Sequence, residues 1–532
     1  MNHIELFAGC GGLSLGLEEA GFELLLANEL SPMAAESFAF NILNENLGTD
    51  ACEGLPRLAE ESTSNRNKMA LWLNSQHKKL KPRLRENPFE YPAFDDPAGY
   101  SDMPKDWSAL KGKLIIGSIT ELNRLIDATP KLSELLNTGF NAPNHLDLVS
   151  GGPPCQSFSM AGKREKDSDK NTLPWQFADF VKHTQPKVAL LENVTGILRP
   201  FKDDEGNQFH AWYEVAKVFG LIGYVPLCLH INARHAGVAQ NRPRFIMLAI
   251  RQNYVNTAIS ELDAESKALF SESLMFYETV QKQRAQLPFG HLTVLDSSKH
   301  KSAFQTELLA PLVSSDEHSV MDAINDLKQN NPSKQSNFVG SLNQKFNFLP
   351  NRNELHNHEF RSNGEIVKRR FRLYQVLQDI DDRAVTQAVF EVLRGNSDEL
   401  TNISWSRLKD FEYRIEAEAL KKFHTKKEME DYLMAHPTKK QTQKALVASK
   451  PAPAALSIPD DACHYDKDEL RVLTVREMAR IQSFPDNFVF RSKVTTGGQM
   501  RKFEVPQYTQ VGNAVPPLLG LALGQVVKQL IK

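Results

Sequence analysis

The chain has 532 residues, which is enough for two to four ordinary domains or for one large domain that carries an insertion. Apolar residues make up 41% and charged residues 24%, a balance that excludes a wholly disordered chain, a collagen-like chain and a disulfide scaffold. The 63 Lys and Arg nearly match the 65 Asp and Glu, so any basic surface must be local.

Signals for targeting and for disulfide formation are sparse. No run of about 18 apolar residues predicts a membrane span. The N-terminal sequence MNHIELFAGC has neither the basic region nor the long apolar core of a secretory signal. The five Cys form no CxxC pair, so we expect reduced thiols rather than disulfides or a metal site. Together these features predict a cytoplasmic protein without membrane contact.

The first 45 residues predict a strand, a glycine turn, a helix and a second strand. An apolar run at 4–8 ends in Gly9-Cys10-Gly11-Gly12, and a second apolar run at 22–27 ends near Glu29. A strand–helix–strand opening of this kind is typical of a parallel sheet. Four further buried strands are expected at 113–116, 147–150, 188–191 and 245–250.

Two stretches interrupt this pattern. Residues 46–112 are polar and include the run 66–85, which has seven basic residues and no acidic one, and we expect an insertion there. Residues 251–470 are helical in character, and 439–455 has the composition of a flexible linker. After residue 471 we expect ordered structure again, with helices at 476–483 and 518–531.

The glycine turn predicts a ligand site. Glycines let the backbone approach a ligand closely, and the helix that follows offers free N–H groups. Ser14 stands where a dinucleotide-binding turn has its third Gly, so a pyrophosphate is disfavoured. Glu29 at the end of the next strand can accept both hydroxyls of a ribose. S-adenosylmethionine fits these features; a purely structural turn is the alternative.

The segment Gly152-Pro153-Pro154-Cys155-Gln156 follows the expected strand at 147–150. The prolines restrict the backbone and present Cys155 at a loop tip, where a thiol close to a cofactor is a plausible nucleophile. A buried, inert Cys is the alternative. The polar residues that follow Cys155 favour the functional interpretation.

Three further segments carry polar groups near strand ends. Glu192 either caps its strand or protonates a ring nitrogen. Arg242 and Arg244 alternate toward one face, which is more often a surface pattern than a catalytic one. The third segment is the polar turn at 510–517, which precedes the terminal helix.

The order of these six motifs resembles that of the cytosine-5 DNA methyltransferases, over residues 1–45, 114–250 and 471–532. The resemblance implies an α/β fold: a doubly wound, mostly parallel sheet that binds S-adenosylmethionine, with an inserted target-recognition domain. We therefore expect a catalytic domain at 1–250 with a polar insertion at 46–112. A recognition domain and linker at 251–470 and a return to the catalytic domain at 471–532 complete the expected arrangement.

The resemblance also implies roles for single residues. Cys155 attacks C6 of a flipped-out cytosine, Glu192 holds and protonates N3, Arg244 contacts the base and Arg242 supports it. Ser118 replaces the family's usual Asp and is expected to accept a weaker hydrogen bond from the adenine amino group. The loop from Gln156 to about residue 173 resembles one that closes over DNA. No metal is expected. The full cofactor set is Phe7, Gly9, Gly11, Gly12, Glu29, Ser118, Ile119, Pro154, Asn513 and Val515.

The expected partner is double-stranded DNA, in a bacterial restriction–modification setting in which a cognate endonuclease acts on the same site. A monomer is the default. Two alternatives stay open: an RNA (tRNA) cytosine-5 methyltransferase, and a non-catalytic DNA-binding protein on the same fold. The insertion at 46–112 is either a second DNA-contacting element, as its basic run suggests, or a solvated insertion, and the solvated interpretation is slightly favoured. The basic cluster at 368–372 either contacts phosphates or lines a solvated helix face, and His356-Asn357-His358 is interpreted as an exposed polar turn.

Overall fold

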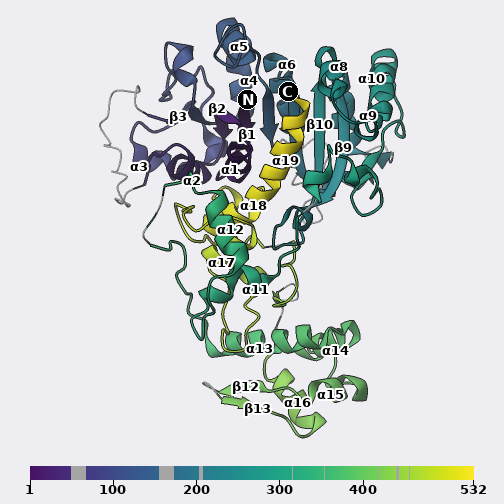
Figure 1. Ribbon diagram of the computed structural model, residues 1–532. Coiled ribbons are helices and arrows are strands. Elements are labelled where there is room, and N and C mark those ends of the chain that lie inside the picture. Colours follow the sequence, from purple (N-terminus) through teal and green to yellow (C-terminus); the bar gives the residue numbers. More distant parts are fainter. Residues whose placement is uncertain are drawn as a thin grey trace.

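The central feature of the computed structural model is one nine-stranded sheet (Figure 1). The structure describes residues 1–48, 68–154, 173–202, 206, 208–313, 315–350, 352, 354–416, 419–438, 443–454 and 456–531. In the order in which they lie, the strands are β11 (Val294–Asp296), β9 (Tyr224–Asn232), β10 (Pro243–Arg251), β6 (Val188–Val194), β5 (Leu148–Gly151), β1 (Asn2–Leu6), β2 (Glu23–Glu29), β4 (Lys113–Ile116) and β3 (Ala70–Trp72).

The sheet is mostly parallel. β10 runs opposite to β6 and β9, while the other neighbours in the sheet are parallel. From β1 the chain winds first toward β2 and β4 and later, through β5, toward β6. The point of reversal between β1 and β5 is where open sheets of this class bind their ligands, at the carboxyl ends of the strands.

Helices cover both faces of the sheet, because its strands are apolar on both sides. On one face, α1 (Gly12–Glu19) and α19 (Pro517–Leu530) pack so closely that a Cβ at Gly16 would lie 2.4 Å from the backbone nitrogen of Leu521. The opposite face is covered mainly by α4 (Ile119–Ala128), α5 (Pro130–Asn137), α6 (Leu173–Thr184), α7 (Ala211–Leu221) and α10 (Ser271–Gln283).

Two smaller bodies extend from this layer (Figure 1). The nearer one has an apolar core of its own, to which the C-terminal segment contributes. It contains α11 (Val320–Ile324), α12 (Asn337–Lys345), α17 (Val475–Ile481) and α18 (Gln507–Asn513). The farther one, with a separate core, contains α13 (Glu365–Ile380), α14 (Arg383–Leu393), α15 (Asn402–Leu408), α16 (Lys426–Met434), β12 (Tyr413–Glu416) and β13 (Ala419–Lys421).

The remaining elements are short or lie at the edges of these layers. They are α2 (Pro32–Ile42), α3 (Leu80–Arg83), α8 (Gln252–Ser260), α9 (Ala264–Ala268), β7 (Phe201–Lys202), β8 (Gln208–Phe209), β14 (Lys444–Ala445) and β15 (Ala462–Cys463). None of the helices in the described ranges is both long and apolar enough to cross a membrane.

The structure confirms the α/β class and the six strands expected from the sequence, and it also differs in places. β3 lies inside the expected insertion and pairs with β4, and β11 lies inside the expected recognition segment and pairs with β9. The expectation of a flexible linker is wrong for 443–454. There β14 pairs with β15, and the backbone N–H of Asn241 donates to Ala452 at 2.8 Å. Buried apolar side chains in this segment hold it against the core.

Candidate active site

The carboxyl edge of the sheet gathers the residues expected to act. β1, β2, β4, β5 and β6 are parallel to one another, so the segments that follow them meet along one edge. The glycine turn follows β1, Glu29 ends β2, Ser118 follows β4, the Pro153-Pro154 segment follows β5, and Glu192 lies near the end of β6. The glycine turn, Glu29 and Ser118 lie at the β1–β2–β4 part of this edge. The Pro153-Pro154 segment and Glu192 lie on the side toward β10.

The glycine turn after β1 has a backbone that requires glycine. Gly9 has φ +57° and Gly11 has φ +100°, and Gly11 precedes the first turn of α1. A Cβ at Gly9 would meet nothing within 4 Å, so this turn faces open space. A Cβ at Gly12, in contrast, would lie 2.2 Å from the carbonyl oxygen of Val515. Gly9 therefore leaves room for a ligand, whereas Gly12 lets the C-terminal segment pack against the turn.

Glu29 braces the glycine turn. Its Oε2 accepts the backbone N–H of Gly9 and its Oε1 that of Ser31, each at 2.8 Å. Burial raises the pKa of the Glu29 carboxyl, and these N–H groups oppose the rise. Each carboxylate oxygen has a second lone pair that can accept a hydroxyl. The donor set and the open space at Gly9 therefore fit a ribose.

Ser118 serves the backbone as well as the open edge. It is the N-cap of α4, and its Oγ accepts the backbone N–H of Thr120 at 3.2 Å. Asn28 holds the same corner, because its side-chain amide donates to the carbonyls of Ile115 and Gly117, both at 3.1 Å. Ser118 is half-buried, and its hydroxyl keeps an acceptor position for a ligand amino group.

Glu192 and Arg244 form a buried ion pair. β10 runs antiparallel to β6, which sets Arg244 opposite Val194 and brings its Nε to 2.6 Å from Oε1 of Glu192. The contact is an ion pair rather than an aligned hydrogen bond. Both residues are only 8% exposed. The other carboxylate oxygen, Oε2, lies 3.0 Å from where a Cβ on Gly152 would be, so it faces the Pro153-Pro154 segment.

Asn193 ties that segment to β6. Its side-chain amide donates to the carbonyl of Pro153 at 2.8 Å. Pro154 is exposed at the end of this segment. Cys155 and the loop 156–172 lie outside the described residues. The structure therefore brings Glu192, Arg244 and the residues immediately before Cys155 together.

Arg242 supports the C-terminal turn instead of joining this ion pair. Its guanidinium donates to the carbonyl of Gly512 at 2.6 Å and to that of Ala514 at 3.0 Å. Arg242 is 3% exposed, and burial lowers the pKa of its guanidinium well below the ordinary value, with the charge of Arg244 acting in the same direction. The turn it holds presents Asn513, which is exposed, and Val515, which is half-buried.

Two features noticed in the sequence lie elsewhere. The cluster at 368–372 does not form a free basic face, because Arg370 donates to Thr438 and Arg372, 8% exposed, donates to the carbonyl of Glu412. The turn at 356–358 is not exposed as expected: Asn357 is 6% exposed and exchanges hydrogen bonds with the backbone of Phe490. Its role is to hold the segment after α17.

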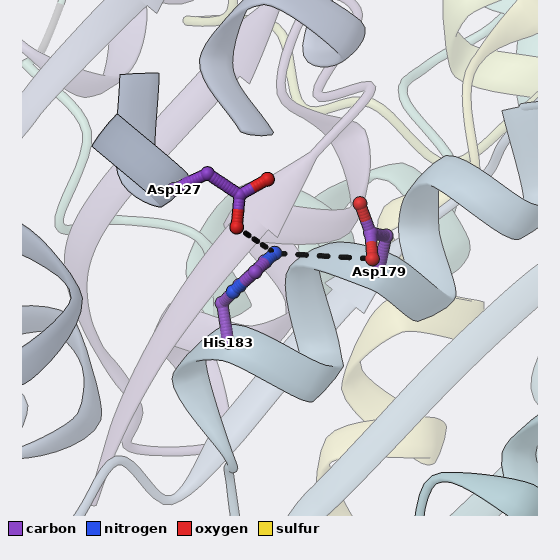
Figure 2. Close-up of side chains that lie close together, drawn as sticks. All are labelled: Asp127, Asp179 and His183. Carbon is purple, nitrogen blue, oxygen red and sulfur yellow. Dashed lines mark ion pairs between the residues drawn. The ribbon is translucent and has the colours of Figure 1, made fainter. Parts of the chain in front are cut away.

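A second group of titratable side chains comprises Asp127 of α4 and Asp179 and His183 of α6 (Figure 2). Nε2 of His183 lies 3.2 Å from Asp127 and 3.8 Å from Asp179. The two carboxylates are 61% and 39% exposed, respectively. A solvated ion-pair cluster accounts for this arrangement.

Sequence reasoning gave no role to Asn193 or Asn28, although both hold the site. Each is a polar residue near the end of an otherwise apolar strand, and that is the signal that could have found them. The sequence could not show what these amides bind, because their partner carbonyls lie 40 residues from Asn193 and 87 residues from Asn28 along the chain.

The mixed sheet, with a glycine turn after its first strand and an acidic residue after its second, is that of an α/β methyltransferase. The sequence profile of C-5 cytosine-specific DNA methylases matches residues 1–51 and 115–529. The chain belongs to this family, and it is a DNA cytosine-5 methyltransferase. The family and the fold imply that it uses S-adenosylmethionine.

Relatives align along nearly the whole chain. The type II methyltransferase M.DdeI of Desulfomicrobium norvegicum is 25% identical over 99% of this chain and 88% of its own length. The type II methyltransferase M1.HphI of Haemophilus parahaemolyticus is 22% identical over 100% of this chain and 87% of its own. Among solved structures, a mutant of Spodoptera frugiperda DNMT2 matches with a TM-score of 0.39 at 11% identity, covering 99% of each chain.

Proposed function

We propose that this enzyme transfers the methyl group of S-adenosylmethionine to C5 of a flipped-out cytosine in a specific duplex DNA sequence, through a covalent bond between Cys155 and C6. The observation that carries the proposal is the ion pair of Glu192 and Arg244, which lies beside the segment that leads directly into Cys155. An apolar pair at this position would stabilise the fold about as well as the buried ion pair, so stability alone does not explain a carboxylate and a guanidinium here.

The glycine turn and its neighbours hold the methyl donor in this proposal. The donor supplies an electrophilic methyl group. Glu29 accepts the ribose hydroxyls with its remaining lone pairs, and Ser118 and Ile119 lie along the adenine end. Gly9 leaves the backbone of the turn accessible, and the positive φ angles of Phe7, Gly9 and Gly11 give the turn its shape. The exposed and half-buried residues that close the site are Pro154, Asn513 and Val515.

The chemistry follows from what cytosine lacks. C5 is a poor nucleophile until a thiolate adds to C6 and places an electron pair at C5. Glu192 protonates N3 and draws electron density from the ring, which makes C6 electrophilic, while Arg244 fixes the carboxyl group against the base. The electron pair at C5 then bonds to the methyl group while the bond between that group and the sulfur of the donor breaks, which leaves the sulfur as a neutral thioether. Loss of the C5 proton to a base expels the Cys155 thiolate, restores the double bond and returns the N3 proton to Glu192.

The substrate of this reaction has to leave the helical stack, because the ring face is inaccessible inside a duplex. We assign recognition of the surrounding sequence to those parts of the two smaller bodies that lie within 251–470. Two of the relatives that align along the chain are named type II methyltransferases. By extension we propose a restriction–modification setting in the bacterial cytoplasm, with an endonuclease acting on the same site and the methyltransferase working as a monomer.

A trapping experiment tests the proposal. A pool of random duplexes containing 5-fluorocytosine is incubated with the enzyme and S-adenosylmethionine, and denaturing gels and peptide mapping then locate the protein–DNA bond. Fluorine at C5 cannot leave as a proton does, so the adduct should persist at Cys155. Cys155→Ala should form no adduct and still bind the methyl donor.

Cys228→Ala serves as the matched control, because this thiol is fully buried in β9 and its pKa is raised by burial. It should form the adduct as the unchanged enzyme does. An adduct at another residue, or none in the whole pool, contradicts the proposed mechanism. Methylation of tRNA in place of duplex DNA would instead reject the substrate.

A further inference from the structure

The segment that follows β3 lies in the part of the chain that the family profile leaves unmatched. The family match stops at residue 51 and resumes at 115. Within 76–85 the chain has five basic residues and no acidic one. Because β3 runs parallel to β4 and β2, this segment leaves the sheet at its carboxyl edge, the edge that carries the candidate active site.

The segment is built around buried charges that are already satisfied. Arg83 binds Asp102 at 2.6 Å and donates to the carbonyls of His77 and Tyr100 at 2.7 and 2.9 Å. Glu86 accepts the backbone N–H of Gln76 at 2.7 Å. Arg83 and Glu86 are 5% and 7% exposed. The loop is therefore held in one shape by its own interior.

Its remaining lysines point outward. Lys78, Lys79 and Lys81 are exposed, while Leu80 between them packs on the core beside α2. None of the three has an ion-pair partner within the described parts of the chain. Three exposed cations, none of them paired with a carboxylate in the described chain and all on a loop held by its own interior, match the repeating charge of a phosphate backbone.

Arg85 continues this basic run. It lies 3.6 Å from Glu36 of α2 and donates to the hydroxyl of Ser492 at 3.0 Å, which joins the loop to the segment after α17. Figure 1 shows α3, which contains Lys81, beside α2. We call Lys78, Lys79, Lys81 and Arg85 the basic ledge.

We propose that the basic ledge binds the phosphates of duplex DNA that flanks the target cytosine. This inference rests on the proposed function. Five strand spacings separate β6, which carries Glu192, from β3. At ~4.8 Å per spacing the ledge lies about 24 Å along the edge, which corresponds to roughly seven base pairs of B-form DNA. The contact therefore concerns DNA outside the immediate target.

The test compares two duplexes that contain the sequence in which this enzyme methylates cytosine. One has ~4 base pairs on each side of the target cytosine and the other has ~15. The triple variant Lys78→Gln, Lys79→Gln, Lys81→Gln should bind the longer duplex more weakly. The salt dependence of its binding should be less steep by about 2 to 3 in log K against log salt, since each lost phosphate contact removes about 0.9. On the shorter duplex the variant and the unchanged enzyme should agree.

The matched control neutralises three exposed lysines near the amino edge: Lys131→Gln, Lys182→Gln and Lys528→Gln. It should leave both slopes unchanged. The proposal is overturned if the ledge variant keeps the slope of the unchanged enzyme on the longer duplex, if its loss is equal on both duplexes, or if the control shows the same loss. If the triple variant unfolds, the single Lys78→Gln, expected to lower the slope by about 0.9, decides by the same criteria.

This outcome is separable from the proposed function. Methyl transfer to the short duplex and the trapped adduct at Cys155 do not depend on the ledge. Failure of the ledge variant to change binding therefore rejects the ledge alone. Absence of any trapped adduct with the unchanged enzyme rejects the function.

Discussion

Arg242 and Arg244 lie at the same edge of the sheet, but we expect Arg242 to have a structural role and Arg244 to act on the base. In Arg242→Met the carbonyls of Gly512 and Ala514 lose their donor, and both bonds come from a charged group that is 3% exposed. Two such bonds contribute about 3–6 kcal/mol. Removing a buried charge offsets part of that loss, so we expect the free energy of unfolding to fall by about 2–4 kcal/mol. A protein with an ordinary stability of about 5–15 kcal/mol remains folded.

The functional effect should appear in the methyl donor site. Without these bonds the turn at 512–515 loosens, so Asn513 and Val515 no longer hold one conformation at the edge. The affinity for S-adenosylmethionine should then fall about tenfold, the equivalent of about 1.4 kcal/mol. Calorimetric titration measures this, and urea unfolding measures the stability. Arg251→Met on the same strand is the control, since Arg251 makes one bond to the carbonyl of Gln185 at the opposite edge. If Arg242→Met bound the donor normally and lost only methyl transfer, Arg242 would act on the base and our reasoning would be refuted.

Two other changes test the neighbouring groups. Glu192→Gln should lower the rate of methyl transfer by roughly 10²–10⁴ with little change in donor affinity, as single-turnover kinetics can show; an unchanged rate removes Glu192 from the chemistry. Glu5, buried in β1 beside Ser14, has a pKa raised from 4.5 to about 8 by burial. Between pH 4.5 and 8 the folded protein keeps Glu5 protonated, whereas the unfolded chain releases that proton. The stabilisation that the protonated carboxyl contributes is therefore complete below pH 4.5 and is lost as the pH rises through 8. Glu5→Gln should remove up to about 5 kcal/mol of that pH dependence from urea unfolding curves, and parallel curves would contradict the assignment.

The sequence predicted the strands of the catalytic sheet whose apolar runs are long enough to be recognised. β3 and β11 have only three residues each and lie in polar surroundings, so their pairing depends on neighbours far along the chain. β9 contains Pro226, which is a signal against a strand inside a sheet. In each case packing on the sheet decided the structure where the local signal was weak or contrary.

The site shows the same division. The glycine turn and Glu29 were predictable because chemistry and backbone geometry fix them locally, as the positive φ of Gly9 shows. The pairing of Glu192 with Arg244 was not, since it depends on β10 inserting antiparallel beside β6. In the same way, no local sequence pattern predicts that Arg242 binds a turn that lies 270 residues later in the chain.

The contacts between the two ends of the chain also imply that donor binding and docking of the C-terminal segment are coupled. Gly12 is in contact with Val515, and α1 packs on α19 without room for a side chain at Gly16. A donor that requires both the glycine turn and the turn at 512–515 binds only when this packing is complete. By mass action it must then stabilise the docked segment, by about 2.7 kcal/mol at a concentration one hundred times its dissociation constant. The proposed donor site is therefore complete only when the C-terminal segment packs on α1, and a change in the packing of α19 on α1 should alter donor affinity without touching any residue proposed to contact the donor.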